Sequence, residues 1–487
     1  MKWSWSLRAC GGTDICTVLL LWFLAFALIS CVSASTIRAG TDVQAAIDKA
    51  QNGDTIVVGP GQYNPFEVDK ALRIVGVGWP VIQAAVQLPG ITITADGVLI
   101  SGFKIKGVPE DSTAKFNYYM QHPTIAKLRL DLPNAGIIVQ GNDVAMQNVV
   151  LFGSQVGVYV DGMINSSIAN VTFDRCSMGV ELLNCRTSHI INSKLSDCDK
   201  SGIDVERSSD ILVDNNSVIN TKNTGILLKA SQVCRLSNNT ASGNTEGIAV
   251  WNSSLTDVQH NRVDRNYYGI LLSGSNNNTV LYNVAQENSR SEIIGGFGVG
   301  ISLQENSSNN IIAGNTASKS LNGLELIKGC MDNVVYSNNA FDNTHGIRVD
   351  KNYNNLIYHN NFIKNTISAY DNSTHNFWNA SVGNYYSDYH GTDRNGDGIG
   401  DQPYAIPMGN TKSIDARPLI KPCSTALLDM NELKTALLKY ARFNPGEDNN
   451  VPYWQVGGTM IIGSTGPTSP PKFSDFNPNF NPTYSSP

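Results

Sequence analysis

The sequence predicts an all-β fold, a right-handed parallel β-helix built from stacked coils of about 22 residues each. Two observations predict this solenoid. A glycine followed by an apolar–x–apolar triplet recurs at a nearly constant interval, and an asparagine follows each of these glycines at a nearly constant offset. A fixed period of this length is typical of repeat architectures, in which one domain grows by adding repeats.

The repeating glycine marks a strand in each coil. The triplet reads VYV after Gly157, IDV after Gly202 and IRV after Gly346. Its first and third residues face one side of a strand and its middle residue faces the other. Glycine suits a bend where side chains are crowded or where φ is positive. The repeat is carried by ten glycines, evenly spaced except for one longer gap after Gly269: Gly136, Gly157, Gly179, Gly202, Gly225, Gly247, Gly269, Gly300, Gly323 and Gly346.

The asparagine column predicts an amide ladder inside the solenoid. Asparagine tolerates the left-handed conformation of a sharp corner. Its amide can donate to the asparagine of one neighbouring coil and accept from the other, which stabilises stacked parallel strands. We therefore expect buried amides even where Asn170, Asn215 and Asn238 lie in N-glycosylation sequons. The predicted ladder is Asn148, Asn170, Asn192, Asn215, Asn238, Asn261, Asn283, Asn315, Asn338 and Asn360.

Two other repetitive folds fit less well. A leucine-rich repeat has a similar period, but it needs leucines at fixed offsets and often a helical return, whereas these returns are rich in Asn, Ser and β-branched residues. A β-sandwich would show turns about every 8 to 12 residues and no asparagine column.

Residues 1–35 are predicted to be a signal peptide. Lys2 and Arg8 give a positive start, and residues 17–30 form an uncharged apolar run. This run is shorter than the roughly 20 residues of a membrane span but suits a signal peptide. The stretch ending at Cys31 resembles a lipobox, which would anchor the chain by lipid, while Val32-Ser33-Ala34 resembles an ordinary cleavage site. No later segment is long and apolar enough to span a membrane, so we expect an extracytoplasmic protein, whether secreted, periplasmic or on the cell surface.

The remaining chain is expected to form a solenoid with a cap at each end, because open solenoid ends expose unpaired strand edges. The β-helix is predicted over residues 36–368, beginning with a cap helix at 41–50 whose Thr41–Gln44 stretch fits a capping box. A C-terminal cap is predicted at 369–422, and a short helix and flexible tail at 423–487. Insertions at 108–135 and 289–299 are expected to form loops on a flank.

The charge composition excludes one class of expected partner. The 35 Lys and Arg against 41 Asp and Glu give a net charge of −6, and no basic run is present, so nucleic acid is not expected as a partner.

Cys176 and Cys198 are separated by one coil length. They would form either a disulfide between neighbouring coils or a stack of two buried thiols.

These features resemble the NosD-type β-helix family, also described as carbohydrate-binding and sugar-hydrolysis (CASH) domains. The matching segments are Val43–Ile47 with Gly53–Tyr63, the coil motif Gly-Ile-x-Leu…Asn-x-(Ile/Val), and Asn384–Asp388 with Gly398–Tyr404. The resemblance covers about residues 36–422 and implies a pectin-lyase-like parallel β-helix. It also implies a periplasmic role in copper-enzyme maturation for some members, while many exported relatives look like cell-surface proteins of unknown ligand.

A short acidic loop in the C-terminal cap predicts calcium. Residues 393–401 read DRNGDGIGD, with oxygen ligands at alternate positions and glycines that allow a tight loop, as at the start of an EF-hand. Tyr404 stands where an EF-hand has its last carboxylate, so a shorter structural calcium loop is expected, and an ion-free Asx-turn loop is the alternative. The expected ligands are Asp393, Asn395, Asp397 and Asp401 through their side chains and Ile399 through its carbonyl.

The repeat register also predicts a polar strip on one outward strand face. Positions two and four after the glycine point outward, and over neighbouring coils they place four carboxylates beside a lysine and a tryptophan. Carboxylates one coil apart can share a proton or bind a cation, and tryptophan can stack on a sugar ring; the alternative is an ordinary solvated face. We name these residues the acidic strip: Tyr159, Asp161, Glu181, Asp204, Glu206, Lys229 and Trp251.

Copper is not expected. The seven histidines are scattered, and neither an HxH motif nor a methionine-rich cluster of the kind that binds Cu(I) is present. Our leading hypothesis is a non-catalytic protein that binds carbohydrate or cell-envelope polymer. A polysaccharide lyase, hydrolase or epimerase acting through the acidic strip is the second hypothesis, and an accessory protein for a metalloenzyme is the third.

Overall fold

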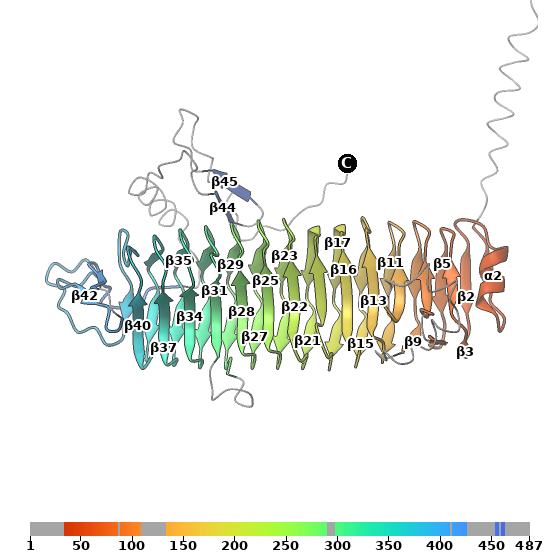
Figure 1. Cartoon of the computed structure of the whole chain (residues 1–487), viewed down its shortest axis with the longest axis horizontal. Helices are drawn as coiled ribbons and strands as arrows, with labels where there is room; N and C mark the ends of the chain where they lie inside the picture. Colours follow the sequence, from red (N-terminus) through yellow and green to blue (C-terminus); the bar gives the residue numbers. More distant parts are fainter. Residues whose placement is uncertain are drawn as a thin grey trace, which may run out of the picture.

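The computed structural model describes residues 34–85, 88–108, 133–289, 298–409 and 412–425, and the backbone of two further strands, β44 (Tyr453–Val456) and β45 (Thr459–Ile462). The expected signal sequence with Cys31, most of both insertions and the helix expected after Cys423 lie outside the described residues. The described coils stack into one long cylinder (Figure 1). Three parallel sheets form its wall, which confirms the predicted right-handed parallel β-helix.

Sheet A contains the first strand of each coil. Each strand pairs in parallel with the equivalent strand one coil later, as Ile168 pairs with Ile190 and Ile190 with Val213. Its strands are β1 (Thr36–Arg38), β2 (Thr55–Val58), β5 (Arg73–Gly76), β8 (Leu99–Ser101), β11 (Ala145–Gln147), β14 (Ser167–Ala169), β17 (Arg186–Ile191), β20 (Ser209–Asp214), β23 (Arg235–Ser237), β26 (Asp257–Gln259), β29 (Thr279–Leu281), β32 (Ile311–Ala313), β35 (Val334–Tyr336) and β38 (Leu356–Tyr358).

Sheet B follows after one corner, and most of its strands are short. Its strands are β3 (Gln62–Tyr63), β6 (Val81–Gln83), β9 (Lys104–Lys106), β12 (Val150–Phe152), β15 (Thr172–Asp174), β18 (Lys194–Ser196), β21 (Ser217–Ile219), β24 (Thr240–Ser242), β27 (Arg262–Asp264), β30 (Val284–Gln286), β33 (Thr316–Ser318), β36 (Asn339–Phe341), β39 (Asn361–Ile363) and β41 (Tyr385–Tyr386).

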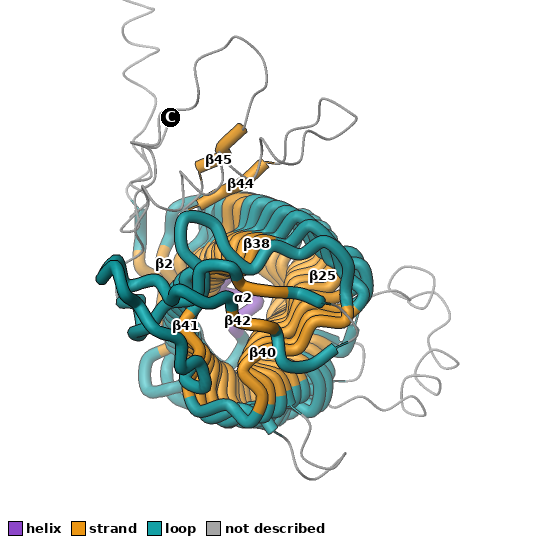
Figure 2. Tube along the Cα trace, turned by 90° about the vertical axis from the view of Figure 1, so that its left-hand side faces the viewer, coloured by secondary structure: helices purple, strands orange, loops and turns teal. Residues whose placement is uncertain are grey.

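Sheet C has mostly longer strands and, in the regular coils, starts beside the repeating glycine. Its strands are β4 (Phe66–Val68), β7 (Ile91–Ile93), β10 (Ala135–Val139), β13 (Val156–Asp161), β16 (Met178–Leu183), β19 (Ile203–Glu206), β22 (Thr224–Lys229), β25 (Glu246–Trp251), β28 (Tyr268–Ser273), β31 (Val299–Gln304), β34 (Asn322–Ile327), β37 (His345–Asp350) and β40 (Ile367–Asn372). Figure 2, an end-on view, shows the three sheets enclosing the interior.

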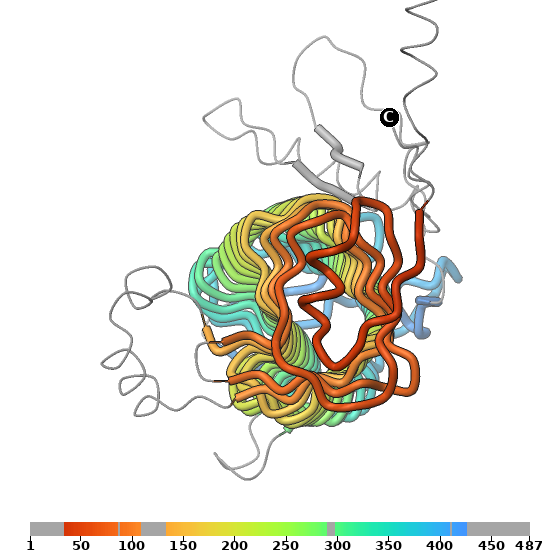
Figure 3. The backbone as a smooth tube through the Cα atoms, turned by 90° about the vertical axis from the view of Figure 1, so that its right-hand side faces the viewer, coloured from red at the N-terminus to blue at the C-terminus, as the bar shows by residue number. Residues whose placement is uncertain are grey.

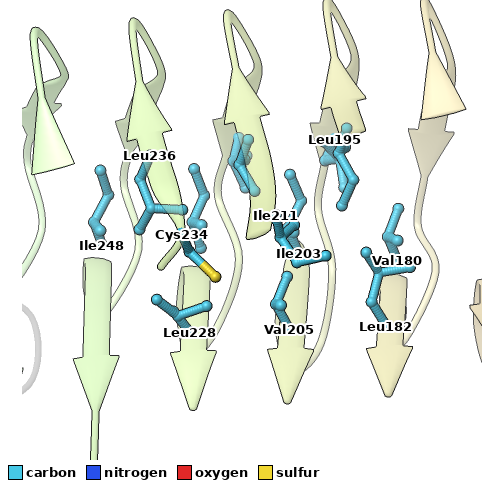
Figure 4. Close-up of a cluster of buried hydrophobic side chains, with 14 of the residues drawn as sticks. Val180, Leu182, Leu195, Ile203, Val205, Ile211, Leu228, Cys234, Leu236 and Ile248 are labelled. Carbon is cyan, nitrogen blue, oxygen red and sulfur yellow. The ribbon is translucent and has the colours of Figure 1, made fainter. Parts of the chain in front are cut away.

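Aliphatic side chains fill the interior. Val180, Leu182, Ile203 and Val205 from sheet C point inward toward residues such as Leu195 from sheet B (Figure 4), and all are at most 1% exposed. The repeating glycines make room for this packing. A Cβ atom at Gly247 would lie 2.6 Å from the carbonyl oxygen of Gly269, so crowding between coils, rather than a positive φ, explains that glycine.

Each regular coil turns from sheet A to sheet B at a residue with positive φ, and the next residue points into the cylinder. The left-handed position holds Asn170 (φ 52°) and Asn215 (φ 53°), and later His260 and Tyr282 (both 56°). Asparagine favours this conformation because its short polar side chain makes local hydrogen bonds.

The predicted asparagine ladder is two columns, and the predicted burial was wrong for its first five members. Amide bonds between coils do form among them, since Asn170 Nδ2 donates to Asn148 Oδ1 at 2.5 Å and Asn215 Nδ2 donates to Asn192 Oδ1 at 2.7 Å. Asn148 is partly exposed and Asn170, Asn192, Asn215 and Asn238 are exposed, because they occupy the left-handed corner position. Asn261, Asn283, Asn315, Asn338 and Asn360 lie one residue later, point inward and are buried as predicted. The amides of Asn170, Asn215 and Asn238, expected to be buried, therefore face outward. The buried ladder runs through Asn216, Asn239, Asn261, Asn283, Asn315, Asn338, Asn360 and Asn384.

Both ends of the cylinder are capped. At the N-terminal end (Figure 3) the helix α2 (Val43–Lys49) covers the first coils, and Val43, Ala46 and Ile47 are buried. Its N-cap is Asp42, whose carboxylate accepts from the Ala45 amide at 3.2 Å, so the expected capping box at Thr41 does not form. At the other end β40 crosses the predicted boundary at 368, and the solenoid continues to β41.

Buried carboxylates hold the C-terminal cap together. Asp415, fully buried, accepts from the Asn384 amide at 2.6 Å and from the Tyr386 hydroxyl at 3.2 Å. Asp371, also fully buried, accepts from Trp378 Nε1 at 2.9 Å. The antiparallel strands β42 (Tyr404–Ala405) and β43 (Ile414–Asp415) complete the described cap.

The structure also decides between the two alternatives for Cys176 and Cys198. Cys176 and Cys198 are buried and free, so of the two alternatives the structure has the stacked thiols. Burial raises the pKa of the Cys176 thiol to about 11.

The segment expected to be a flexible tail contains the antiparallel pair β44 and β45, which the sequence analysis did not predict.

Candidate ligand-binding face

The outer face of sheet C gathers polar side chains in two parallel columns, as the glycine register predicts. In the first column Tyr159 pairs with Glu181 and Glu181 with Asp204. In the second column Glu206 pairs with Lys229 and Lys229 with Trp251. Asp161 precedes them in the second column, with Leu183 between it and Glu206. Sheet C therefore brings all seven residues of the acidic strip together.

Asp204 is the most perturbed group of the acidic strip. Burial, then repulsion from Glu181 and Glu206, raises the pKa of Asp204 to about 7, and Lys229 opposes this rise. Burial and the negative charge of Glu206 also raise the pKa of Glu181. Asp204 Oδ1 is buried and accepts no hydrogen bond from the described residues. Near neutral pH the strip can therefore hold a proton that is easily lost.

The second column is an ordered charge network at the edge of the sheet. Asn184 Nδ2 donates to Asp161 at 2.7 Å, and Arg207 Nε donates to Asn184 Oδ1 at 3.2 Å. Arg207 also pairs with Glu206, whose other oxygen lies 3.5 Å from Lys229 Nζ. The Nε1 group of the partly buried Trp251 finds no acceptor among the described residues. These contacts fix the orientation of the charged side chains and leave one indole donor without a partner.

An apolar stretch follows the acidic strip on the same face. The first column continues through Leu227, Ala249 and Leu271, which are 7%, 0% and 5% exposed although they point away from the core. Tyr268 and Tyr267 pack edge to face nearby, with ring centroids 4.7 Å apart. This middle section of the face is therefore apolar and almost inaccessible to solvent, and it separates the acidic strip from the polar side chains in the later coils.

A second polar cluster, which the sequence analysis missed, continues the first column beyond Leu271. Glu325 is only 4% exposed, and its carboxylate accepts from Ser302 Oγ at 2.9 Å and from Asn322 Nδ2 at 2.7 Å. Arg348 approaches Glu325 at 3.4 Å and Asp350 at 2.9 Å. Burial raises the pKa of Glu325, while its hydrogen bonds and Arg348 oppose the rise.

This cluster orients a histidine. His345 Nδ1 lies 2.9 Å from Asn322 Oδ1, which links the ring through Asn322 to Glu325. Burial and Arg348 lower the pKa of His345, so the neutral imidazole is favoured. The guanidinium of Arg348 lies over the Tyr370 ring, 5.6 Å from its centroid. The signal for the cluster was present in the sequence, since Ser302, Glu325 and Arg348 each stand two positions after a repeating glycine.

The acidic loop of the C-terminal cap is closed by its own amides. Asp393 accepts from the amides of Gly396 and Gly398 at 2.8 and 3.0 Å. Asp397 accepts from Ile399, and Asp401 accepts from Thr392 Oγ1 at 2.7 Å. Asn395 Nδ2 donates to Asp397 at 3.0 Å. This arrangement matches the Asx-turn alternative, and calcium binding at the loop stays a prediction.

Within the described ranges, no three side chains of His, Cys, Asp or Glu converge in a way that could hold a metal ion. His345 belongs to the sheet C cluster, whereas His359 stacks on Tyr336 at the corner that follows sheet A, with ring centroids 5.5 Å apart. None of the helices described is long and apolar enough to cross a membrane.

Several solved structures are similar to this chain. The Dettilon tailspike protein gp208 matches at 16% identity over 63% of this chain and 67% of that chain, with a TM-score of 0.50. The A-module of the Azotobacter vinelandii mannuronan C-5 epimerase AlgE6 matches at 14% over 69% and 92%, with a TM-score of 0.46. PfbA, a surface adhesin of Streptococcus pneumoniae, matches at 15% over 70% and 92%, with a TM-score of 0.39. At these identities the likeness concerns the fold alone.

A protein-family model, described as periplasmic copper-binding protein (NosD), matches residues 92–293 and 289–391. These residues span sheet C from β7 to β40, and so include the whole candidate face. No curated protein is similar enough in sequence to match the chain.

Proposed function

The chain belongs to the NosD family, and from that premise we propose that it is an extracytoplasmic β-helix protein that binds a carbohydrate or cell-envelope polymer along the outer face of sheet C. The family's periplasmic description supports a location outside the cytoplasm, where such polymers occur. The earlier expectation of an exported protein agrees with this location.

The observation that carries the proposal is the run of polar and aromatic side chains across neighbouring coils. Parallel strands repeat about every 4.8 Å, so the first column offers Tyr159, Glu181 and Asp204 at equal intervals. An extended polymer can contact such a face unit by unit, as other solenoids bind along extended surfaces. Carboxylates accept from sugar hydroxyls, and Trp251 supplies a flat apolar surface with an N–H donor.

A glycan array probed with the chain from residue 36 onward tests this proposal. We expect selective retention of a glycan set, and an affinity loss of tenfold or more in Trp251→Ala and in Glu181→Gln. Ile219→Ala is the matched control, because Ile219 is an exposed apolar residue on sheet B, away from the proposed face. Equal losses in all three variants, or no retained glycan, would contradict the proposal.

Acid–base chemistry is a second candidate function, and the raised pKa of Asp204 favours it. A carboxyl group that titrates near neutral pH can take a proton from a substrate or return one. Incubation of the retained glycan with the protein, followed by product analysis, separates the two functions. A catalytic strip predicts turnover that is lost in Asp204→Asn while binding remains, and a binding protein predicts no turnover in either form.

The family is described as copper-binding, so copper is a further ligand to test. The expectation that this chain holds none stays a prediction, and metal analysis of the purified protein after exposure to Cu(I) and Cu(II) tests it. Copper retained at one equivalent after dialysis would favour the role in metalloenzyme maturation.

A further inference from the structure

The outer face of sheet A changes character along the cylinder. In early coils its outward residues are polar or only partly buried, such as Gln147, Ile191 and Asp214. From Leu281 in β29 onward its outward residues are apolar and at most 3% exposed, although they point away from the core. We call them the apolar face of sheet A: Leu281, Ile311, Ala313, Val334, Tyr336, Leu356 and Tyr358.

Aromatic rings dominate the end of this face. Tyr336 stacks on Tyr358 with ring centroids 4.8 Å apart, and His359 stacks on Tyr336 at 5.5 Å. Both tyrosines are 0% exposed. An outward strand face stays this dry only when other parts of a protein lie on it, because water reaches an uncovered sheet face.

Residues 423–425, which follow the C-terminal cap, lie at the edge of this face. The amide of Cys423 donates to Asn361 Oδ1 at 2.8 Å, Asn361 Nδ2 donates to the Cys423 carbonyl at 2.8 Å, and Asn339 Nδ2 donates to Thr425 Oγ1. Asn361 and Asn339 begin β39 and β36, at the corner between sheets A and B. Residues 423–425 are thus tied to the edge of the apolar face and run from later coils toward earlier ones.

The strand β44 lies against β32, in the middle of the apolar face. Figures 1 and 2 both show β44 and β45 beside the outer side of sheet A. The chain continues from residue 425 to residue 487, and this part opens with leucines at helical spacing: Leu427, Leu428, Leu433, Leu437 and Leu438. The sequence thus supplies an apolar segment that starts at one edge of this face and leads to the strand that lies on β32.

We propose that residues 426–462 are an intramolecular cover for the apolar face of sheet A. The cover keeps this face from associating with other molecules. A second copy of the chain is the competing occupant, but the anchoring at Cys423 and Thr425 and the position of β44 favour the chain's own segment.

Tyrosine nitration with tetranitromethane, read by mass spectrometry, tests the cover. Tyr353 is 40% exposed and reports full reactivity, while Tyr386 is in the core and reports an intact fold. In the full chain we expect nitration of Tyr353 and protection of Tyr336 and Tyr358. In a chain that ends after residue 425, Tyr336 and Tyr358 should react within a few-fold of Tyr353 while Tyr386 stays protected. A chain that ends after residue 462 is the matched control and should keep the protection.

Protection of Tyr336 and Tyr358 in the chain ending at 425 would overturn the proposal, and so would protection in the full chain that disappears on dilution, which would indicate a second copy. If the shortened chain unfolds and Tyr386 reacts, the full-length Leu433→Asp/Leu437→Asp variant decides. Reactive Tyr336 and Tyr358 with protected Tyr386 would support the cover, and any other pattern in that variant would overturn it.

Discussion

The side-chain Nδ2 of Asn261 donates to Asn283 Oδ1 at 3.0 Å, one coil away, and the Asn261 backbone amide donates to the same oxygen at 2.9 Å. Asn283 Nδ2 in turn donates to the Val258 carbonyl at 2.8 Å. Each rung of this buried ladder thus satisfies backbone groups of its neighbours as well as the next amide. Backbone groups at these corners would otherwise be buried without partners.

Asn283→Ala should destabilise the fold by about 3 kcal/mol, because it removes two hydrogen bonds from Asn261 and leaves the Asn261 backbone amide without an acceptor in the interior. Asn215→Ala is the matched control, since Asn215 is exposed at the left-handed corner one residue out of the ladder. It should cost about 1 kcal/mol, mainly because alanine tolerates the left-handed conformation less well. Urea denaturation followed by circular dichroism measures both, and similar midpoints for the two variants would contradict the ladder's role.

Gly247→Ala should destabilise strongly, by about 3 kcal/mol or more, because its Cβ would lie 2.6 Å from the Gly269 carbonyl oxygen and 2.8 Å from Asn266 Nδ2. Gly59→Ala should change stability by about 0.5 kcal/mol or less, since nothing lies within 4 Å of a Cβ there. Thermal unfolding of both variants checks this pair, and tolerance at position 247 would show that coils do not pack as closely as described.

Asp204 should make the fold less stable as pH rises. Its pKa of about 7 lies above the unfolded value of 3.8, so the native state holds the proton more tightly. The stabilisation is complete below the unfolded pKa and is lost as pH rises through about 7. Relative to Asp204→Asn, the wild-type protein should lose about 1 to 3 kcal/mol between pH 4 and pH 8, after allowance for solvent screening. Denaturation curves at several pH values measure this difference, and parallel pH profiles of the two proteins would exclude a perturbed Asp204.

The loop at residues 393–401 is the predicted calcium site. If it binds the ion, calcium should raise the unfolding temperature of the protein, because a ligand that binds only the native state stabilises it by mass action. Asp393→Ala/Asp397→Ala should abolish that rise, whereas Glu305→Ala, a change at an exposed carboxylate remote in sequence, should keep it. Equal unfolding temperatures with calcium and with a chelator would leave the loop as an Asx-turn structure.

Periodicity made the fold predictable because every coil repeats the same demands on its residues. Glycine crowding, inward aliphatics and left-handed corners each recur once per coil, so spacing alone aligns them. Spacing could not separate neighbouring positions that favour the same residue type. The pairs Asn215-Asn216 and Asn238-Asn239 place an asparagine at both the corner and the ladder position, and the predicted column passed from one to the other.

The candidate face was predictable in position but incomplete in extent. The register placed Glu181 and Asp204 side by side, since outward positions follow from strand alternation. The same register places Ser302 and Glu325 on this face as well. They lie beyond the long insertion before Gly300, and the sequence-based prediction did not include them. The burial that shifts the pKa of Asp204, and the bridge from His345 through Asn322 to Glu325, depend on three-dimensional packing that strand alternation does not specify.

Carboxyl footprinting with a glycan that the protein retains tests the central claim most directly. Chemical labelling of carboxylates, read by mass spectrometry, reports which acidic side chains a bound polymer covers. We predict that saturating glycan reduces labelling of Asp161, Glu181 and Glu206 several-fold and leaves the exposed Asp199 and Glu305 unchanged. Protection that falls on other residues while these three stay fully labelled would show that the polymer binds elsewhere.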